Sequence, residues 1–165
     1  MALTSSERIK MNCFLLLFGL KDIPLIGTAG VRIVELDDTR CIIRVPMKRR
    51  NKNHLGSMYF GALAIGADCA GALMAFFENR RRGNPVNFVF KDFHADFLKR
   101  PEADTLFTCG DVAAVRAAFD EALRTGERVN VPLRVTATTP SKLGDEPVAV
   151  FQLTLSLKKR ADRKT

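Results

Sequence analysis

The sequence is poor in the residues that metal sites and disulfide frameworks need. It has two histidines, His54 and His94, and four cysteines, none of them spaced as a CxxC pair. Two histidines exclude a His-rich metal site, and cysteines scattered through apolar segments indicate buried, reduced thiols instead of disulfides or bound zinc. We therefore predict no metal and no resident cofactor, and a reducing location such as the cytoplasm.

The sequence also lacks a clear membrane signal, although two apolar stretches imitate one. Residues 11–20 follow basic residues as in a signal peptide, but the run is short, and charged residues follow without a cleavage site. Residues 55–77 are long enough to span a bilayer, yet Asp68 lies at their centre, where a carboxylate costs about 2.5–3.5 kcal/mol. We predict no membrane partner, an N-terminal packing helix over 5–20 and a buried central helix over 58–78.

Acidic residues are too few to balance the basic ones. The 165 residues include 26 Lys and Arg against 18 Asp and Glu, a formal net charge of +8. Nucleic acid, anionic lipid or a phosphorylated small molecule would suit this charge. The chain has no zinc-finger spacing and no aromatic recognition motif, so we predict no nucleic-acid partner. The basic tail 158–165 is expected to fray, whereas three internal runs are candidates for a phosphate-binding rim: Lys48–Arg50, Arg80–Arg82 and Lys99–Arg100.

Hydrophobic periodicity predicts one α+β domain over residues 1–165. The last two expected strands alternate polar and apolar residues and should pair as an antiparallel hairpin. Pro132 lies inside one of them and predicts an edge position or a bulge. An amphipathic helix over 113–124 precedes that hairpin, and residues 21–29 are expected to form a loop. The expected strands cover residues 30–36, 40–45, 87–98, 105–111, 129–137 and 149–157.

The central helix holds the carboxylate with most chemical interest. It is apolar all round, so other structure must wrap it, and its only charged residues are Asp68 and the terminal Glu78. Ser57 is its expected N-cap. A lone carboxylate in such a helix must find a partner or have its pKa raised by desolvation. Asp68 is therefore either a structural hydrogen-bond acceptor or a functional group.

The beginning of the same helix offers a second feature. Backbone N–H groups near Met58 to Gly61 lack intrahelical partners, and Gly61 has no side chain to block approach. Such a helix end can bind an anion or stabilise an oxyanion. Asp68 lies on the same face, but about 10 Å further along the axis at 1.5 Å per residue. A substrate that touches both groups is expected to need a second subunit.

The stretch from Asn53 to Asp68, NHLGSMYFGALAIGAD, resembles the signature of hotdog-fold acyl-CoA thioesterases of the phenylacetyl-CoA thioesterase type. The pattern of that family is N-x-x-G-x-x-H-G-G, then six residues, then Asp or Glu. Asn53, Gly56, Gly61 and Asp68 fall on it without gaps. The segment HADFLKRP resembles the family's N-F-L-R-P strand. The likeness covers roughly residues 30–110 and the last two strands.

The resemblance implies a hotdog fold, in which a mostly antiparallel sheet wraps the central helix, and a dimer or tetramer whose sites use groups from two subunits. It implies that Asp68 acts on a thioester carbonyl as general base or nucleophile. The Gly61 N–H would hold the oxyanion, and Asn53 would position the water or the acyl carbonyl. Gly56 belongs to the same substrate-binding loop.

An acyl-CoA substrate would also explain the basic charge, because coenzyme A carries phosphates. Coenzyme A would enter only as part of the substrate. Guanidinium and ammonium groups bind phosphate well, and two basic runs qualify: Arg80, Arg81 and Arg82, and Lys99 with Arg100.

The sequence departs from the family pattern at two positions of the motif. Tyr59 stands where the family has His, and Phe60 stands where it has the first Gly. Tyr59 would either donate a hydrogen bond in place of His or simply line the acyl pocket. The helix 113–124 is an insertion in a strand connection that is usually tight. Two functions of this fold therefore stay open, an acyl-CoA thioesterase and a non-catalytic acyl-CoA-binding protein. A basic nucleic-acid-associated protein is the third and weakest alternative.

Overall fold

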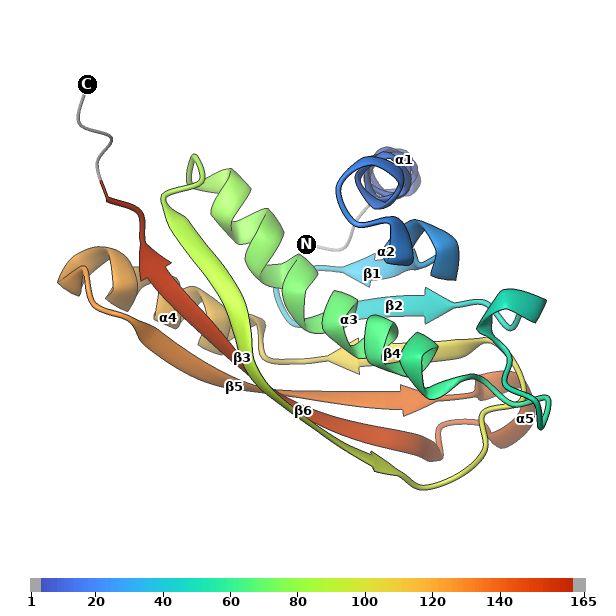
Figure 1. Cartoon of the computed structure of the whole chain (residues 1–165). Helices are drawn as coiled ribbons and strands as arrows, with labels where there is room; N and C mark the ends of the chain where they lie inside the picture. The colour runs from blue at the N-terminus through green and yellow to red at the C-terminus, as the bar shows by residue number, and fades with distance from the viewer. Residues whose placement is uncertain (1–3, 162–165) are drawn as a thin grey trace.

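Six strands form one antiparallel sheet in the spatial order β1-β2-β4-β5-β6-β3, and the helix α3 (Phe60–Arg81) crosses one face of it (Figure 1). The computed structural model describes residues 4–161. The predicted α+β architecture is confirmed. The strands are β1 (Arg32–Leu36), β2 (Cys41–Val45), β3 (Val86–Phe97), β4 (Thr105–Cys109), β5 (Val129–Thr138) and β6 (Pro147–Lys159).

The helix α3 is long and apolar enough to cross a membrane by length and composition, but more than half of its most apolar window is buried in this fold. Its inner side packs on the sheet at very close range. A Cβ added at Gly66 would lie 2.4 Å from the ring of Phe107 on β4. Only a residue without a side chain fits under that ring, which accounts for the glycine at this position.

Two helices precede the sheet. The helix α1 covers Ser5–Lys21, close to the predicted span, and Asn12 fixes it to β1 through two hydrogen bonds with the backbone of Ile33. Residues 21–29, expected as a loop, instead contain the helix α2 (Pro24–Ala29). That expectation was wrong because Pro24 begins this helix and Gly30, with φ of 72°, ends it, which is the usual use of these residues at helix ends.

The edge strand β3 contains a bulge that keeps its aromatic side chains on one face. Its register with β6 shifts between Phe90 and Asp92, and the Asp92 carboxylate accepts the N–H of Thr154 there. Phe88 and Phe90 before the shift and Phe93 and Phe97 after it all pair with buried positions of β6. One extra residue changes which side of the strand faces the core. Sequence periodicity did not reveal this bulge.

The strands β5 and β6 pair in register over nearly their whole length, as the predicted hairpin requires. Pro132 lies in β5, which is an internal strand. Only residues 135–138 of β5 pair with β4, so Pro132 still lies at a locally open edge, as predicted. The helix α4 (Val112–Thr125) occupies that opening, and the Asp111 side chain accepts the N–H of Arg134 where β4 has ended.

Several local expectations were wrong. Ser57 is not the N-cap of α3, which begins at Phe60 with Tyr59 as its cap and runs to Arg81 instead of ending at residue 78. Cys13 is exposed on α1, although the other three thiols are buried as expected. The tail assigned to residues 158–165 belongs to β6 as far as Lys159, and residues 162–165 lie outside the described residues.

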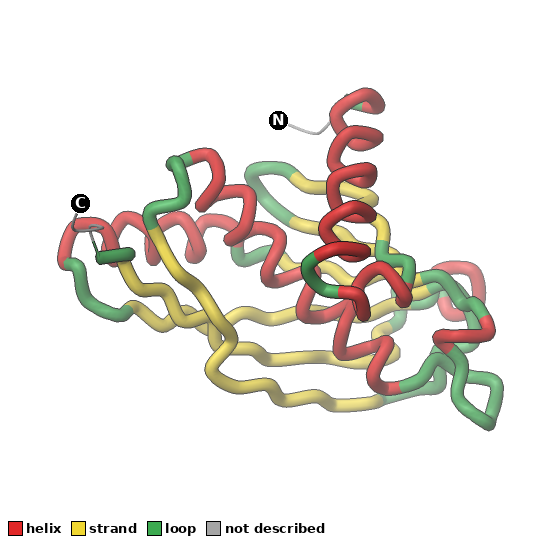
Figure 2. The backbone as a smooth tube through the Cα atoms, turned by 45° about the horizontal axis from the view of Figure 1, so that its top comes forward, coloured by secondary structure: helices red, strands yellow, loops and turns green. Residues whose placement is uncertain are grey.

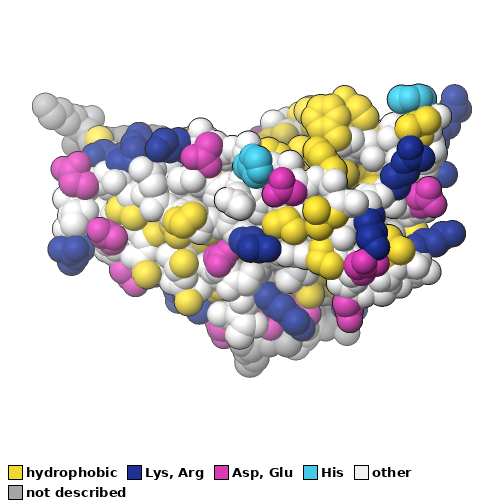
Figure 3. Space-filling view, turned by 90° about the horizontal axis from the view of Figure 1, so that it is seen from below, with side chains coloured by type: hydrophobic (Ala, Val, Ile, Leu, Met, Phe, Trp, Pro, Cys, Tyr) yellow, Lys and Arg dark blue, Asp and Glu magenta, His cyan; other side chains and the backbone are white. Residues whose placement is uncertain are grey.

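The face of the sheet that points away from α3 carries basic and acidic side chains intermixed, and hydrophobic side chains gather along one edge of this view (Figure 3). The structure leaves several large apolar side chains exposed on or beside the edge strand β3. They are Val89, Phe93, Phe97 and Leu98; Tyr59 and Phe60 at the beginning of α3 are exposed as well.

Candidate active site

Asp68 lies halfway along α3 and faces an apolar cavity of about 280 Å³. The walls come from α1, α2, α3 and the first half of β3, so residues far apart in the sequence meet around one carboxyl group. Asp68 is the only charged residue in that lining. The others are apolar: Leu15, Phe18, Ile23, Ile26, Cys69, Ala72, Leu73, Phe76, Phe88, Val89 and Phe90.

Burial raises the pKa of Asp68 above the ordinary value of an aspartate, because the charged form loses hydration among apolar walls. Among residues 4–161 no group donates a hydrogen bond or forms an ion pair with this carboxylate. Such a carboxylate is a better proton acceptor than an exposed one. It is also poised to titrate nearer to neutral pH, which is typical of general bases.

The first turn of α3 leaves backbone donors open. Ala62 and Leu63 donate their N–H groups to the carbonyl of Tyr59, whereas the N–H groups of Phe60 and Gly61 have no acceptor in the described chain. The Tyr59 ring lies against Gly61, since a Cβ there would meet its Cε1 at 2.6 Å. Tyr59 is about half exposed, so this ring can move. Gly61 thus presents an open donor beside the Tyr59 ring.

Asn53 and Gly56 belong to a tight turn before the helix. The Asn53 side-chain oxygen accepts the N–H groups of Leu55 and Ser57, and its amide donates to the Ser57 hydroxyl at 3.0 Å. Gly56 has φ of 81°, a left-handed conformation that favours glycine. The structure therefore shows Asn53 and Gly56 shaping the loop, and Ser57 is engaged in that loop instead of capping α3.

A second cavity, of about 320 Å³, lies along the same side of α3 nearer its beginning. Gly61 and Ile65 line this second cavity, whereas Asp68 and Ala72 line the first one. The four residues are spaced by four, three and four positions and therefore lie on one face of the helix. Arg50 also lines the second cavity, and its guanidinium lies against Gly30 at the end of α2. One face of α3 therefore joins an apolar cavity to a cavity with a cationic wall.

The predicted phosphate-binding residues have different surroundings. Arg81 and Arg82 both donate to Glu78, at 2.7 and 2.6 Å. Arg80 stacks over the ring of Phe14, 5.2 Å from its centroid, and forms no ion pair among the described residues. Lys99 pairs with Glu146, and Arg100 is exposed. The structure does not bring Lys99 and Arg100 together with Arg80, Arg81 and Arg82, because β3 separates the two runs.

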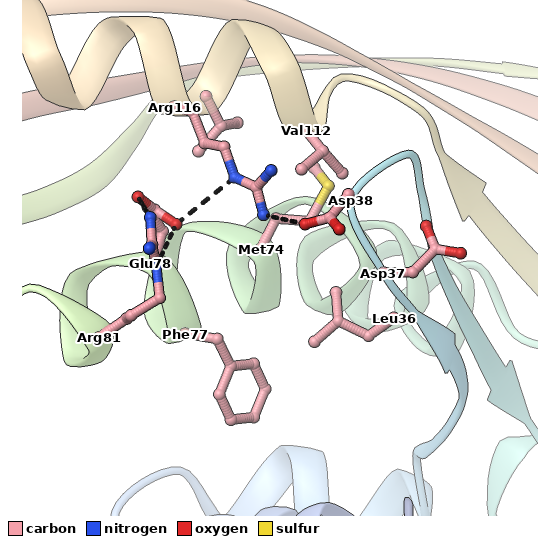
Figure 4. A pocket seen from close by; sticks show the side chains of 10 residues that line it. Leu36, Asp37, Asp38, Met74, Phe77, Glu78, Arg81, Val112 and Arg116 are labelled. Carbon is pink, nitrogen blue, oxygen red and sulfur yellow. Dashed lines mark hydrogen bonds and ion pairs between the residues drawn. The ribbon is translucent and has the colours of Figure 1, made fainter. Parts of the chain in front are cut away.

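A polar pocket surrounds the end of α3 (Figure 4). Glu78 is 6% exposed and lies among Arg81, Arg82 and Arg116, and Arg116 reaches Asp38 in the β1–β2 turn at 2.6 Å. Burial alone would raise the pKa of Glu78, but hydrogen bonds from the arginines outweigh it and lower the pKa. The network ties α4 and the β1–β2 turn to the end of the central helix.

Sequence reasoning missed three residues near the site. Asn51 is buried and donates to the carbonyls of Ala29 and Pro46, and its own carbonyl accepts the N–H of Tyr59. It thus fixes the end of α2 to the beginning of α3. Phe18 and Phe76 line the Asp68 cavity and are in contact. No local pattern marks such residues, because their partners are distant in the sequence.

No three His, Cys, Asp or Glu residues within 4–161 could hold a metal ion.

Comparisons with known proteins place the fold. A search of curated proteins finds no match. The structure is similar to a protein of unknown function from Chlorobaculum tepidum, with 17% identity, 93% of this chain and 97% of that chain covered, and a TM-score of 0.78. It is also similar to a Pseudomonas aeruginosa protein described as a probable thioesterase. The identity is 23%, the match covers 92% of this chain and 96% of that chain, and the TM-score is 0.74.

A Haemophilus influenzae thioesterase is similar at 14% identity, with 90% of this chain and 92% of that chain covered and a TM-score of 0.65. These likenesses confirm the predicted hotdog fold. Residues 12–150 match a domain of unknown function. The chain is therefore a hotdog-fold member of the family DUF4442.

Proposed function

We propose that this protein hydrolyses an acyl-CoA thioester, with Asp68 as general base toward water or as nucleophile. The observation that supports it most is the position of Asp68, the one charged group lining an otherwise apolar cavity. An acyl chain fits such walls. The cavity has nearly twice the volume of an apolar cavity of roughly 150 Å³ that takes up benzene. The thioester carbonyl would then lie at the carboxylate.

In this proposal the open N–H of Gly61 holds the oxyanion, and Tyr59 turns away or donates a hydrogen bond to the same oxygen. Gly61 and Asp68 of one chain are two helical turns apart, so one carbonyl cannot contact both within a single subunit. The missing donor has to come from a second chain. Thioesterase-like neighbours support a small-molecule thioester as the substrate.

The edge strand β3 offers a surface for that second chain. Only β6 pairs with it, and Phe93 and Phe97 stay about half exposed on its core-facing side. After α3 the chain turns back, so β3 begins near the end of α3 and ends near its beginning, where Met58 donates to Pro101. Antiparallel pairing of two β3 strands would bring the beginning of one α3 toward the middle of the other, and so toward Asp68.

Positive charge near the cavities supports a substrate with phosphates. Arg50 lines the cavity beside Gly61, and Arg80 lies over Phe14, whose ring stacks on the cavity residue Phe76. Arg81, Arg82 and Lys99 are held by carboxylates. We therefore assign phosphate contacts to Arg50 and Arg80 within this proposal.

The test is hydrolysis of a panel of acyl-CoA substrates, followed with a thiol reagent, by the wild-type protein and by Asp68→Asn. The proposal expects turnover of at least one aryl or medium-chain substrate and its loss in the variant. No turnover across the panel, or full activity in Asp68→Asn, would contradict it. Circular dichroism on both proteins checks that the variant is folded.

The second candidate is a non-catalytic acyl-CoA-binding protein. The position of the Tyr59 ring favours it, because the ring lies against Gly61, whose N–H hydrolysis would use. Acyl-CoA binding measured by calorimetry in the absence of turnover would support this candidate over the first. The replacement Tyr59→His separates them further, since it would raise hydrolysis only if the chemistry of the site is otherwise intact.

A further inference from the structure

The outer face of α1 carries an apolar stripe that no part of the described chain covers. Leu15 and Phe18 face inward and line the Asp68 cavity, whereas five other apolar residues, among them the adjacent Leu16 and Leu17, lie on the opposite side of the helix. Leu17 and Leu20 are 66% and 64% exposed, and Leu25 on the adjoining α2 is 66% exposed. Figure 2 shows the first turns of α1 projecting from the rest of the chain. The stripe consists of Ile9, Cys13, Leu16, Leu17 and Leu20.

Single exposed leucines are common on soluble proteins, but a continuous stripe of this kind marks an interaction surface. Its occupant can be inferred from the charges beside it. Lys10 and Lys21 lie along one side of the stripe, as their helical positions require. On the other side, Arg8 and Arg32 line a groove together with Ile9, Cys13 and Leu16.

These four basic residues form no ion pair within residues 4–161. In this they differ from Arg81 and Arg82 at the end of α3, which form ion pairs with Glu78. The nearest acidic residue in sequence, Glu7, is engaged in the capping box of α1 with Thr4, and Asp22 follows the last turn. The stripe is thus an apolar strip flanked on both sides by basic residues that form no ion pair within residues 4–161.

We propose that the outer face of α1 docks this protein on an anionic lipid surface. Exposed leucines on one side of a helix insert into the interface of such a bilayer, and basic residues beside them are attracted to its anionic head groups. A second copy of this chain is a poorer occupant, because two α1 helices packed face to face would bring lysines against lysines. The sequence-based expectation of no membrane partner considered only spanning and signal segments, and this peripheral contact replaces it.

The test is flotation of the full-length protein with vesicles of phosphatidylglycerol mixed with phosphatidylcholine, compared with phosphatidylcholine alone. The proposal expects binding to the anionic vesicles only, and weaker binding as salt is raised. Leu17→Ser combined with Leu20→Ser should abolish flotation. Lys10→Glu combined with Lys21→Glu should weaken it about tenfold or more, since each lysine near the surface contributes. Both leucines are exposed, so circular dichroism should show an unchanged fold.

The matched control is Arg124→Glu combined with Lys142→Glu, two exposed positions outside α1 and α2 that change the net charge by the same amount. It should bind vesicles like the wild type. Equal loss in this control, no flotation of the wild type, or unchanged flotation of the leucine variant would overturn the proposal. Light scattering tests whether the stripe is instead a contact between two copies of the chain. If the leucine variant changes the number of subunits, the stripe is a contact between chains, and the lipid assignment is wrong.

Discussion

Two carboxylates on one helix have opposite surroundings. Asp68 faces an apolar cavity and has no partner within residues 4–161, and burial raises its pKa. Glu78, ten residues later, is more deeply buried as a side chain but lies among three arginines, of which Arg81 and Arg82 lower its pKa. Burial alone therefore does not identify a functional acid. What distinguishes Asp68 is burial without compensation, which costs stability and is retained where chemistry needs it.

The largest expected difference between Asp68 and Glu78 is the effect of their replacement on activity. Asp68→Asn should lower kcat/KM for a hydrolysed acyl-CoA by about 10²–10⁴, the usual contribution of a general base. Glu78→Gln should leave kcat/KM within a few-fold of wild type, because Glu78 lines a different pocket. Steady-state kinetics of both variants measure this. Equal losses would mean that the two carboxylates do not differ in role.

The Asp68 site should need two chains, whereas the Glu78 network is complete within one. Phe93→Glu places a charge on the half-exposed core-facing side of the edge strand, where we expect the second β3 to pair. Light scattering should show the wild type as a dimer or tetramer and this variant as a smaller species with at least tenfold lower activity. Asp96→Lys, an exposed change on the opposite side of β3, is the control. A monomeric wild type with full activity would refute the shared site.

Replacing Glu78 and replacing Asp68 should change the free energy of unfolding in opposite directions. Glu78→Gln leaves partly exposed arginines without their acceptor and should cost about 1–2 kcal/mol at neutral pH. Asp68→Asn removes an uncompensated charge and should leave stability unchanged or raise it. Urea unfolding of each variant gives both values. The reverse order, with Asp68→Asn the less stable, would point to a structural role for Asp68.

The pH dependence of these differences follows from the two pKa shifts. The raised pKa of Asp68 favours the fold at a pH below the ordinary Asp value of about 3.9, and that contribution is lost as pH rises through the folded-state pKa. The gain in Asp68→Asn should therefore vanish in acid. Glu78 has a lowered pKa, so it stabilises above the ordinary Glu value of about 4.3, and its contribution is lost as pH falls. Unfolding curves at several pH values test both slopes.

Substitutions at two glycines of α3 should also differ in their effects on stability and activity, by smaller amounts. Gly66→Ala would drive a methyl group into the fully buried Phe107 and should cost about 1–3 kcal/mol by overpacking. Gly61→Ala meets only the movable Tyr59 ring, so stability should change by about 1 kcal/mol or less, while activity falls. Thermal unfolding and kinetics on both variants check this. The backbone N–H is kept in Gly61→Ala, so full activity in this variant would contradict the expectation that the substrate needs a position without a side chain here.

Much of this structure was predictable from local sequence. The apolar pattern around Asp68 predicted a wrapped helix, and alternation predicted the β5–β6 hairpin. The Glu78 network was not predictable, because Arg116 and Asp38 are about forty residues away on either side and meet only in the folded chain. Spacing sets which residues share a face of one element, but it does not show which elements meet.

Two errors had signals that were present in the sequence. Pro24 and Gly30 bracket α2 as helix start and stop, yet the short segment read as a loop. The step from Phe90 to Phe93 breaks the alternation of β3 and marks its bulge. The N-cap error had a competing cause. Ser57 is a good capping residue, but Asn53 engages it in the preceding turn, and a tertiary bond from Tyr59 to Asn51 sets where α3 begins.

The central claim is that Asp68 is a reactive carboxylate because its charge is buried and uncompensated. Its most direct test is the pH dependence of kcat/KM for the best acyl-CoA substrate of the wild-type protein. Activity should rise with pH through a pKa above that of an ordinary aspartate, and any residual activity of Asp68→Asn should lack that limb. A profile that is flat above about pH 4, or a limb that persists in Asp68→Asn, would contradict the account.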